Sequence, residues 1–97
     1  MIVVRDVFRL KYGQAKPALA AWKEGRQMLT GPKSVRLLTD LIGTSYTFVL
    51  ETTFTNMAEV ESVMHKVMEN PAWGKWYHEK FVPNVESGYR EVFTIVE

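Results

Sequence analysis

The sequence has 97 residues, a length that fits one domain, because single domains commonly contain ~100–150 residues. Apolar residues make up 46% of the chain and charged residues 24%, a balance that excludes an intrinsically disordered protein. The lack of cysteine excludes disulfides, thiolate metal sites and cysteine nucleophiles, and a net charge of +1 excludes strong overall attraction to nucleic acid. We therefore expect residues 1–97 to form one globular domain.

The N-terminus lacks the pattern of a signal peptide, because Arg5 and Asp6 follow directly after a short apolar start. No apolar run approaches the ~20 residues that a membrane-spanning helix needs. These features predict a cytoplasmic protein that does not associate with membranes.

Residues 2–10 alternate in polarity along β-branched and aromatic residues, which predicts a strand. Asp6 is the exception on its more apolar side, which otherwise carries Ile2, Val4, Phe8 and Leu10. A buried carboxylate is costly without a partner. We therefore expect Asp6 to have a structural partner or, as the alternative, to act as a general base.

A helix and two strands are predicted next. Residues 15–29 place apolar side chains at helical spacing. Residues 34–42 and 45–54 are predicted as strands, joined by a tight hairpin turn at Gly43 and Thr44.

The second half of the chain is predicted to contain two helices and a final strand. Asn56 is a good N-cap, with Glu59 three residues later as in a capping box, and the apolar positions that follow recur at helical spacing. Asn70-Pro71 starts a shorter helix with an aromatic side, made of Trp73, Trp76, Tyr77 and Phe81. Residues 89–96 alternate in polarity and predict the last strand.

The element order βαββαβ is typical of an α+β, ferredoxin-like fold with an antiparallel sheet. Right-handed crossovers would place both main helices on one face of that sheet. We assign to the covered face the bulky residues Ile2, Val4, Phe8, Tyr46, Phe48, Leu50, Phe93 and Ile95. The opposite face then carries smaller apolar residues and charges, namely Val3, Val7, Val49, Val92, Val96, Arg5, Arg9, Glu51 and Arg90. The reverse assignment of the two faces stays open.

Two helices can cover only one face of the sheet, although apolar residues occur on both. An uncovered apolar face indicates a partner, and the simplest partner is a second copy related by two-fold symmetry. Two such sheets packed face to face would form a β-barrel with the helices outside. We therefore expect a homodimeric α/β barrel.

Two stretches of the sequence resemble a known group. The start Val4–Gly13 and the stretch Asn70–Trp76 are similar to the dimeric α/β-barrel superfamily, in particular to its NIPSNAP-like branch. The resemblance implies a homodimer with a cavity between each sheet and its helices, or inside the barrel. The superfamily includes cofactor-free monooxygenases, haem-degrading enzymes and isomerases.

Haem degradation is disfavoured by the residues present. The haem-degrading members carry a tryptophan and a histidine across the second helix and its extension, and an asparagine on the first strand. Aligned on the Trp73 segment, the tryptophan position falls near Val67 and the histidine position near Tyr77. His78 is one residue away, a rotation of ~100° on a helix. Residues 2–10 contain no asparagine.

Four residues are candidates for binding a small molecule. Trp76 and Tyr77 lie on the aromatic helix, which could close the mouth of a pocket for a flat, apolar ligand, unless these rings only pack the core. Arg5 and Glu51 are charged residues within apolar strands. Arginine there could hold an anionic group by paired hydrogen bonds, and the alternative is pairing with Glu51 within a partly solvated face.

No metal or cofactor is predicted. His65 has Glu61 and Glu69 at i±4 spacing, which suits ion pairing on a helix surface. His78 lacks the spacing of a metal-binding motif, and no GxSxG sequence or glycine-rich phosphate loop occurs.

RNA recognition motifs share the same element order, but the sequence disfavours RNA binding. The strand around residues 45–51 lacks the basic residue, the glycine and the final aromatic residue of that motif, and Glu51 would repel phosphate. We expect a homodimer with a small-molecule pocket that acts as a cofactor-independent enzyme of the monooxygenase or isomerase type. The alternative is a non-catalytic, NIPSNAP-like module that binds a ligand or a protein.

Overall fold

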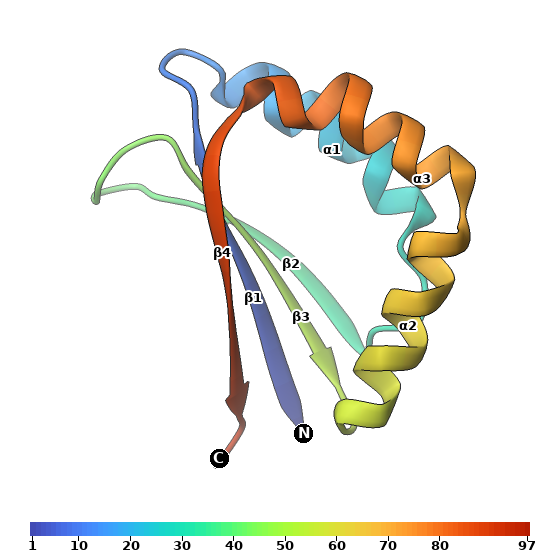
Figure 1. Cartoon of the computed structure of the whole chain (residues 1–97). Coiled ribbons are helices and arrows are strands. Elements are labelled where there is room, and N and C mark those ends of the chain that lie inside the picture. Colours follow the sequence, from blue (N-terminus) through green and yellow to red (C-terminus); the bar gives the residue numbers. More distant parts are fainter.

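Four strands form one antiparallel sheet in the computed structural model, which describes residues 1–97 (Figure 1). The strands are β1 (Ile2–Leu10), β2 (Ser34–Thr39), β3 (Thr47–Phe54) and β4 (Val85–Thr94). Their order across the sheet is β2-β3-β1-β4, so the two central strands are β3 and β1. The ferredoxin-like fold class predicted from the sequence is confirmed.

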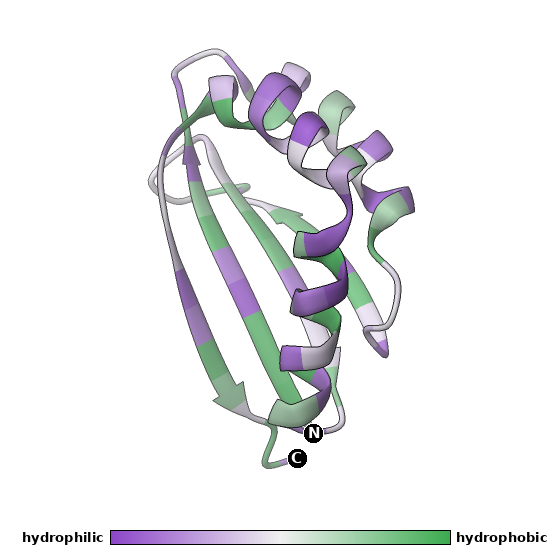
Figure 2. Ribbon diagram, turned by 45° about the vertical axis from the view of Figure 1, so that its right-hand side comes forward, coloured by the Kyte–Doolittle hydropathy of each residue, from purple (hydrophilic) through white to green (hydrophobic).

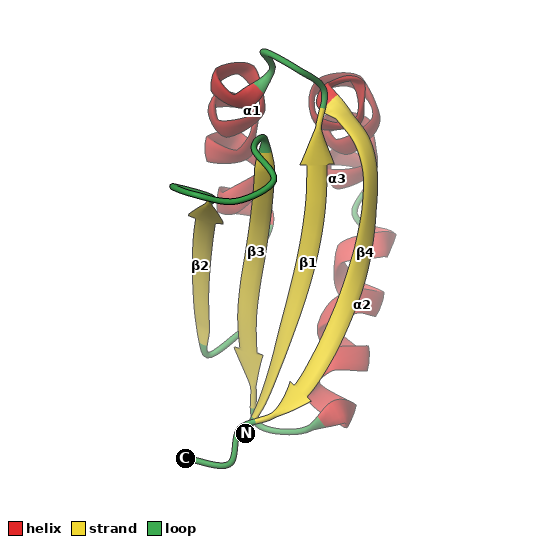
Figure 3. Cartoon of the chain, turned by 90° about the vertical axis from the view of Figure 1, so that its left-hand side faces the viewer, coloured by secondary structure: helices red, strands yellow, loops and turns green.

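All the helices lie on one side of this sheet (Figure 3). They are α1 (Ala15–Met28), α2 (Met57–Glu69) and α3 (Pro71–Trp76), and α3 continues into the π-helical turn Tyr77–Phe81 and the 3-10 turn Val82–Asn84. The turns of α2 that face away from the sheet are mostly hydrophilic (Figure 2). None of the helices combines the length and the apolar character needed to cross a membrane.

The predicted caps set where the later helices begin. The Oδ1 atom of Asn56 accepts a hydrogen bond of 3.0 Å from the Glu59 amide at the start of α2. The Glu59 carboxylate in turn accepts one of 3.3 Å from the Thr55 amide, one residue before the cap. Asn70 caps α3 in the same way, by accepting a hydrogen bond of 3.0 Å from the Ala72 amide. Each cap satisfies a backbone donor that the first helical turn leaves free.

An aromatic cluster joins the helices to the covered face of the sheet. The Trp22 ring of α1 lies 6.0 Å from Phe48 and 5.2 Å from Trp76, measured between centroids. Phe81 stacks on Trp76 at 5.7 Å, and its own side chain is fully buried. A smaller cluster between α2 and the sheet contains Val60 and Val63 of α2 with Val4 and Phe54 of the strands. Rings of this size contribute most of the apolar burial that holds the helices on the sheet.

The predicted tight turn at Gly43 is wrong. β2 ends at Thr39, and a longer loop leads to β3 at Thr47. Ser45 and Tyr46 have positive φ angles of 68° and 54°, whereas Gly43 does not. The Asp40 carboxylate accepts hydrogen bonds from the Ser45 and Thr47 amides and so stabilises this backbone. An aspartate that binds amides ahead of it replaces the glycine-based hairpin.

The faces of β4 are also opposite to the prediction. Val92 pairs with Val4, and Arg90 pairs with Asp6, so Arg90 and Val92 lie on the helix side of the sheet. Phe93 pairs with Val3 and lies on the open face. Alternation along one strand separates two faces but does not say which one meets the helices, because the register with the neighbouring strand decides it. On β1 and β3 the predicted faces are confirmed, since Val4 and Phe48 are buried beneath the helices.

Candidate functional site

A carboxylate and a guanidinium meet on the helix side of the sheet. Asp6 of β1 and Arg90 of β4 are directly opposite in the register, and Arg90 Nε donates a hydrogen bond of 2.6 Å to Asp6 Oδ1. The Asp6 side chain is only 13% exposed, whereas that of Arg90 is half-exposed. Charge-assisted hydrogen bonds of this length are the strong ones in proteins. The structural partner that the sequence predicts for Asp6 is therefore Arg90.

Tyr77 brings a phenol to the same charged pair. Burial raises the pKa of the Tyr77 phenol, the Asp6 carboxylate raises it further, and the Arg90 guanidinium lowers it. Burial and a nearby negative charge both disfavour the phenolate. Tyr77 is therefore a neutral hydroxyl at physiological pH, able to donate a hydrogen bond to an oxygen placed beside it.

Aromatic side chains pack against the Tyr77 ring. The Tyr77 ring stacks on Trp73 at 6.3 Å and lies 5.7 Å from Phe81. The π-helical turn that begins at Tyr77 ends before Asn84, whose side-chain amide donates a hydrogen bond of 2.9 Å to the Lys80 carbonyl. Short π-helical segments occur often at functional sites, where they redirect a side chain from the regular helical path.

The surface beside this cluster is apolar and open to solvent. Val92, next along the helix side of β4, is 46% exposed. On α2, Met64 and Met68 lie ~100–140° around the helix axis from Val63, whose side chain is close to Gly31. With His65, these two methionines line a shallow hollow formed by α2 alone, with no residue of the charged pair or Tyr77 in its lining. Apolar walls with a few fixed polar groups are the usual composition of a small-molecule site.

A second hollow lies at one end of the open face. It has a volume of about 260 Å³, and Arg9 is its only charged lining residue. Arg9 Nη1 donates a hydrogen bond of 3.4 Å to the Thr44 carbonyl, and Arg9 Nε lies 4.0 Å from Glu86. The other lining residues with polar side chains are Thr44, Thr47, Ser87 and Tyr89.

Trp76 lies in the packed core. Its ring is 3% exposed, and its Nε1 donates a hydrogen bond of 2.7 Å to the Ala21 carbonyl of α1. The ring occupies the space beside Gly25, where a Cβ atom would overlap it. With its only donor already bonded, Trp76 fits the packing role that the sequence left as the alternative to ligand contact.

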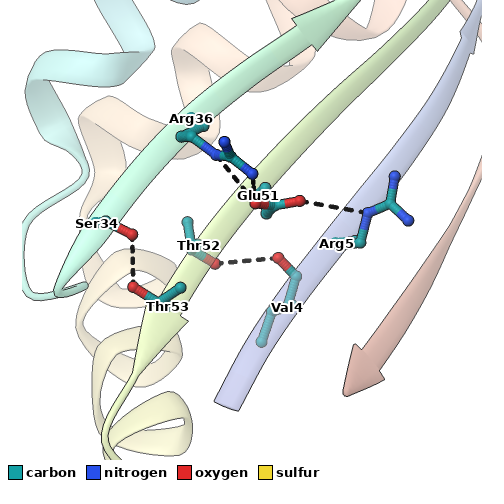
Figure 4. Close-up of polar contacts among 7 residues, drawn as sticks. All are labelled: Val4, Arg5, Ser34, Arg36, Glu51, Thr52 and Thr53. Atoms are coloured by element: carbon teal, nitrogen blue, oxygen red, sulfur yellow. Dashed lines mark hydrogen bonds and ion pairs between the residues drawn. The ribbon is translucent and has the colours of Figure 1, made fainter. Parts of the chain in front are cut away.

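Arg5 and Glu51 lie on the open face, across the sheet from Tyr77. Arg5 Nε is 3.6 Å from Glu51 Oε2, and Arg36 of β2 donates a hydrogen bond of 3.1 Å to Glu51 Oε1 (Figure 4). The pairing within the sheet that the sequence allowed is therefore present. The four predicted site residues fall on two sides of the sheet, with Arg5 and Glu51 together on one and Trp76 and Tyr77 together on the other.

Of the two charged residues in the helix-side cluster, one could be recognised from its position in the sequence and the other could not. Asp6 stands out as the charged residue on an apolar strand face. Arg90 escaped prediction because the alternation of β4 was placed on the wrong face. An aspartate and an arginine that each interrupt an apolar strand face would have been the usable signal, since buried charges require partners.

Solved structures share this fold along almost the whole chain. An uncharacterised NIPSNAP-domain protein from Burkholderia xenovorans is 17% identical, with a TM-score of 0.90 over 99% of this chain and 95% of that chain. A NIPSNAP-family protein from Agrobacterium tumefaciens is 14% identical, with a TM-score of 0.89 over 99% of this chain and 86% of that chain.

A candidate antibiotic biosynthesis monooxygenase from Nitrosomonas europaea is 13% identical, with a TM-score of 0.77 over 100% of both chains. No protein-family model and no curated protein matches the sequence. The predicted resemblance is confirmed at the level of the fold: this chain has the ferredoxin-like fold of NIPSNAP-domain and monooxygenase-like proteins.

Proposed function

We propose that this protein is a homodimer that binds a small, flat organic molecule on the helix side of each sheet, next to Tyr77. The observation that carries the proposal is the Asp6–Arg90 pair with the neutral Tyr77 hydroxyl beside it, bordered by an open apolar surface. A ligand with an oxygen substituent could accept a hydrogen bond from Tyr77 while its ring covers Val92. Of the four residues predicted from the sequence, Tyr77 is the one that this site uses directly.

The proposed activity is that of a cofactor-independent monooxygenase or isomerase. Both reactions begin when a proton leaves a carbon or an oxygen of the substrate and negative charge develops on a substrate oxygen. Donors fixed in place before the reaction stabilise such charge, and Tyr77 and the half-exposed Arg90 are the donors available here. Asp6 is the nearby carboxylate that could accept the proton. The fold shared with a candidate antibiotic biosynthesis monooxygenase supports the oxygenase form.

Binding without catalysis is the second candidate function. The Asp6 carboxylate already accepts the Arg90 hydrogen bond, which supports a structural role for this ion pair. In that case Tyr77 and the apolar surface would hold a ligand, and no residue would move a proton. This alternative corresponds to a carrier or sensor built on the same scaffold.

The homodimer is proposed to form through the open face of the sheet. Tyr89 and Phe93 are exposed on that face, and the helices of the chain all lie on the other one. Apolar rings in this position favour a partner that buries them. In a two-fold dimer, each subunit would cover Tyr89 and Phe93 of the other.

The test is to incubate the protein with a panel of aromatic and polyketide-like phenols under oxygen, following oxygen consumption and product formation. For the enzyme, Tyr77→Phe should lower kcat/KM about 100-fold, because one hydrogen-bond donor to a developing oxyanion is lost. Tyr12→Phe, at an exposed ring on a loop, is the matched control and should have no effect. Saturable binding without turnover would support the carrier, and absence of both binding and turnover would overturn the proposal.

A further inference from the structure

Four charged residues form one row across the open face of the sheet, with one residue from each strand. Arg36 of β2 is opposite Glu51 of β3, Glu51 is opposite Arg5 of β1, and Arg5 is opposite Glu91 of β4. Read across the sheet, the charges therefore alternate: positive, negative, positive, negative. Figure 4 shows the first three of them pointing along this row.

The hydrogen-bonding capacity of the row is only partly used within the chain. Glu51 accepts a hydrogen bond from Arg36 Nε. Arg5 Nε is 3.6 Å from Glu51, too far for a hydrogen bond, and this buried nitrogen has no other hydrogen-bond partner. A buried donor without an acceptor is destabilising, so Arg5 is the point of the row where a further acceptor would have most effect.

Two less polar rows flank the charged one. On one side the register aligns Leu38, Val49, Val7 and Tyr89. On the other side it aligns Ser34, Thr53, Val3 and Phe93. A partner that covers the face must therefore match a charged strip between two strips of different polarity.

A second copy can match this pattern in one orientation of the two-fold axis. An axis parallel to the strands, between β3 and β1, reverses the order of the strands in the facing sheet. Arg36 then faces the partner's Glu91, and Glu51 faces the partner's Arg5, so every facing pair has opposite charge. The row of Leu38 and Tyr89 also faces its own copy.

The perpendicular axis fails the same test. An axis that runs along the charged row keeps the order of the strands and places each charge over its own copy. All facing pairs would then have like charge, which strongly disfavours an interface. It would also place the row that contains Leu38 against the row that contains Ser34.

We propose that the alternating row Arg36–Glu51–Arg5–Glu91 makes the open face self-complementary and sets the two-fold axis of the homodimer parallel to the strands. This inference rests on the proposed homodimer and adds its geometry. It assigns β2 of each subunit to lie over β4 of the other, and it supplies Arg5 Nε, which has no hydrogen-bond partner within the chain, with the partner's Glu51 as an acceptor.

Two charge reversals in separate chains test the inference. In homodimers, Arg36→Glu would face the partner's Glu91, and Glu91→Lys would face the partner's Arg36, so each variant alone should dimerise at least about tenfold more weakly than the unmodified protein. In a heterodimer from an equimolar mixture, the two altered residues would face each other with opposite charges, and the second contact would keep the original pair of Arg36 and Glu91. The mixture should therefore form heterodimers, detected by sedimentation velocity and by native mass spectrometry with one chain isotopically labelled.

Controls separate this inference from the dimer proposal. Lys75→Glu mixed with Glu61→Lys alters exposed charges on the helices and should leave self-association unchanged. If Arg36→Glu fails to fold by circular dichroism, Arg36→Gln replaces it, because its mixture with Glu91→Lys still removes the like-charge contacts. A monomeric unmodified protein would overturn the homodimer itself. A dimeric unmodified protein whose two variants dimerise normally, or whose variants fail to associate on mixing, would overturn only the assigned axis.

Discussion

The two faces of the sheet are built from the same alternating strands, yet they carry different chemistry. The helix-side face buries large rings, such as Phe48 beneath Trp22, and admits one charged pair, Asp6 with Arg90. The open face spreads its charges in a row and leaves Phe93 exposed. Close packing is thus completed within the chain on one face, whereas the other face presents a surface with defined rows.

The largest expected effect comes from opening the packed face. Phe48→Ala should lower the free energy of unfolding by about 3–5 kcal/mol, because it leaves a cavity among Trp22, Phe8 and Phe81. Urea denaturation measures the change. Met68→Ala, at a side chain exposed on α2, is the control and should stay within about 0.5 kcal/mol. Equal losses in the two variants would contradict the packing described for the helix-side face.

A second pair of variants compares the two faces along a single strand. Phe93 and Val92 are neighbours in β4 with exposures of 45% and 46%, but they lie on opposite faces. Phe93→Asp should weaken dimerisation about 100-fold, since it removes apolar burial and places a charge in the proposed interface. Val92→Asp should leave the dimer mass unchanged in light scattering. A dimer that survives Phe93→Asp would refute the open face as the interface.

The close approach of α1 and α3 gives a smaller effect. A Cβ atom at Gly25 would overlap the Trp76 ring, so Gly25→Ala should cost about 1–3 kcal/mol of stability through overpacking. At Gly74 of α3 a Cβ atom would meet nothing within 4 Å, and Gly74→Ala should stabilise the helix by up to about 1 kcal/mol. Thermal unfolding of both variants measures the difference, and the same sign for both would contradict this packing.

The smallest effect concerns the ionisation of Tyr77. Burial and the Asp6 carboxylate raise the pKa of the Tyr77 phenol in the folded protein. The neutral phenol therefore stabilises the fold at every pH below the ordinary pKa of tyrosine. This contribution is lost as the pH rises through the raised pKa of Tyr77 in the folded state. The ionisation step of Tyr77 in an absorbance titration is identified as the one that disappears in Tyr77→Phe. In Asp6→Asn that step should move to lower pH, because a negative charge has been removed. A titration of Asp6→Asn identical to that of the unmodified protein would show that Asp6 does not act on Tyr77.

Local features of the chain could be predicted from the sequence, whereas of the long-range pairings only that of Arg5 with Glu51 was anticipated, as an alternative. Alternation gave the bounds of β1, and the side chains of Asn56 and Asn70 gave the starts of two helices, because each depends on residues close in sequence. The partner of Asp6 is 84 positions away in the sequence, and only the register of β4 on β1 identifies it. The prediction for the loop after β2 was wrong for another reason. There Asp40 stabilises positive φ angles at Ser45 and Tyr46, although neither residue is a glycine.

Sensitivity to acid follows from that same loop. Hydrogen bonds from the backbone, chiefly from the Thr47 amide, hold the pKa of the Asp40 carboxyl below its ordinary value. The contribution of these hydrogen bonds to the stability of the folded protein is therefore fully present at neutral pH. It is lost as the pH falls through the lowered pKa of Asp40 in the folded state. Leu41 and Ile42 at the tip of the loop are 98% and 95% exposed. When Asp40 is protonated and its hydrogen bonds to the loop weaken, we expect an acid protease to cleave first at these aliphatic residues. In strongly acidic buffer we also expect aggregation to begin there.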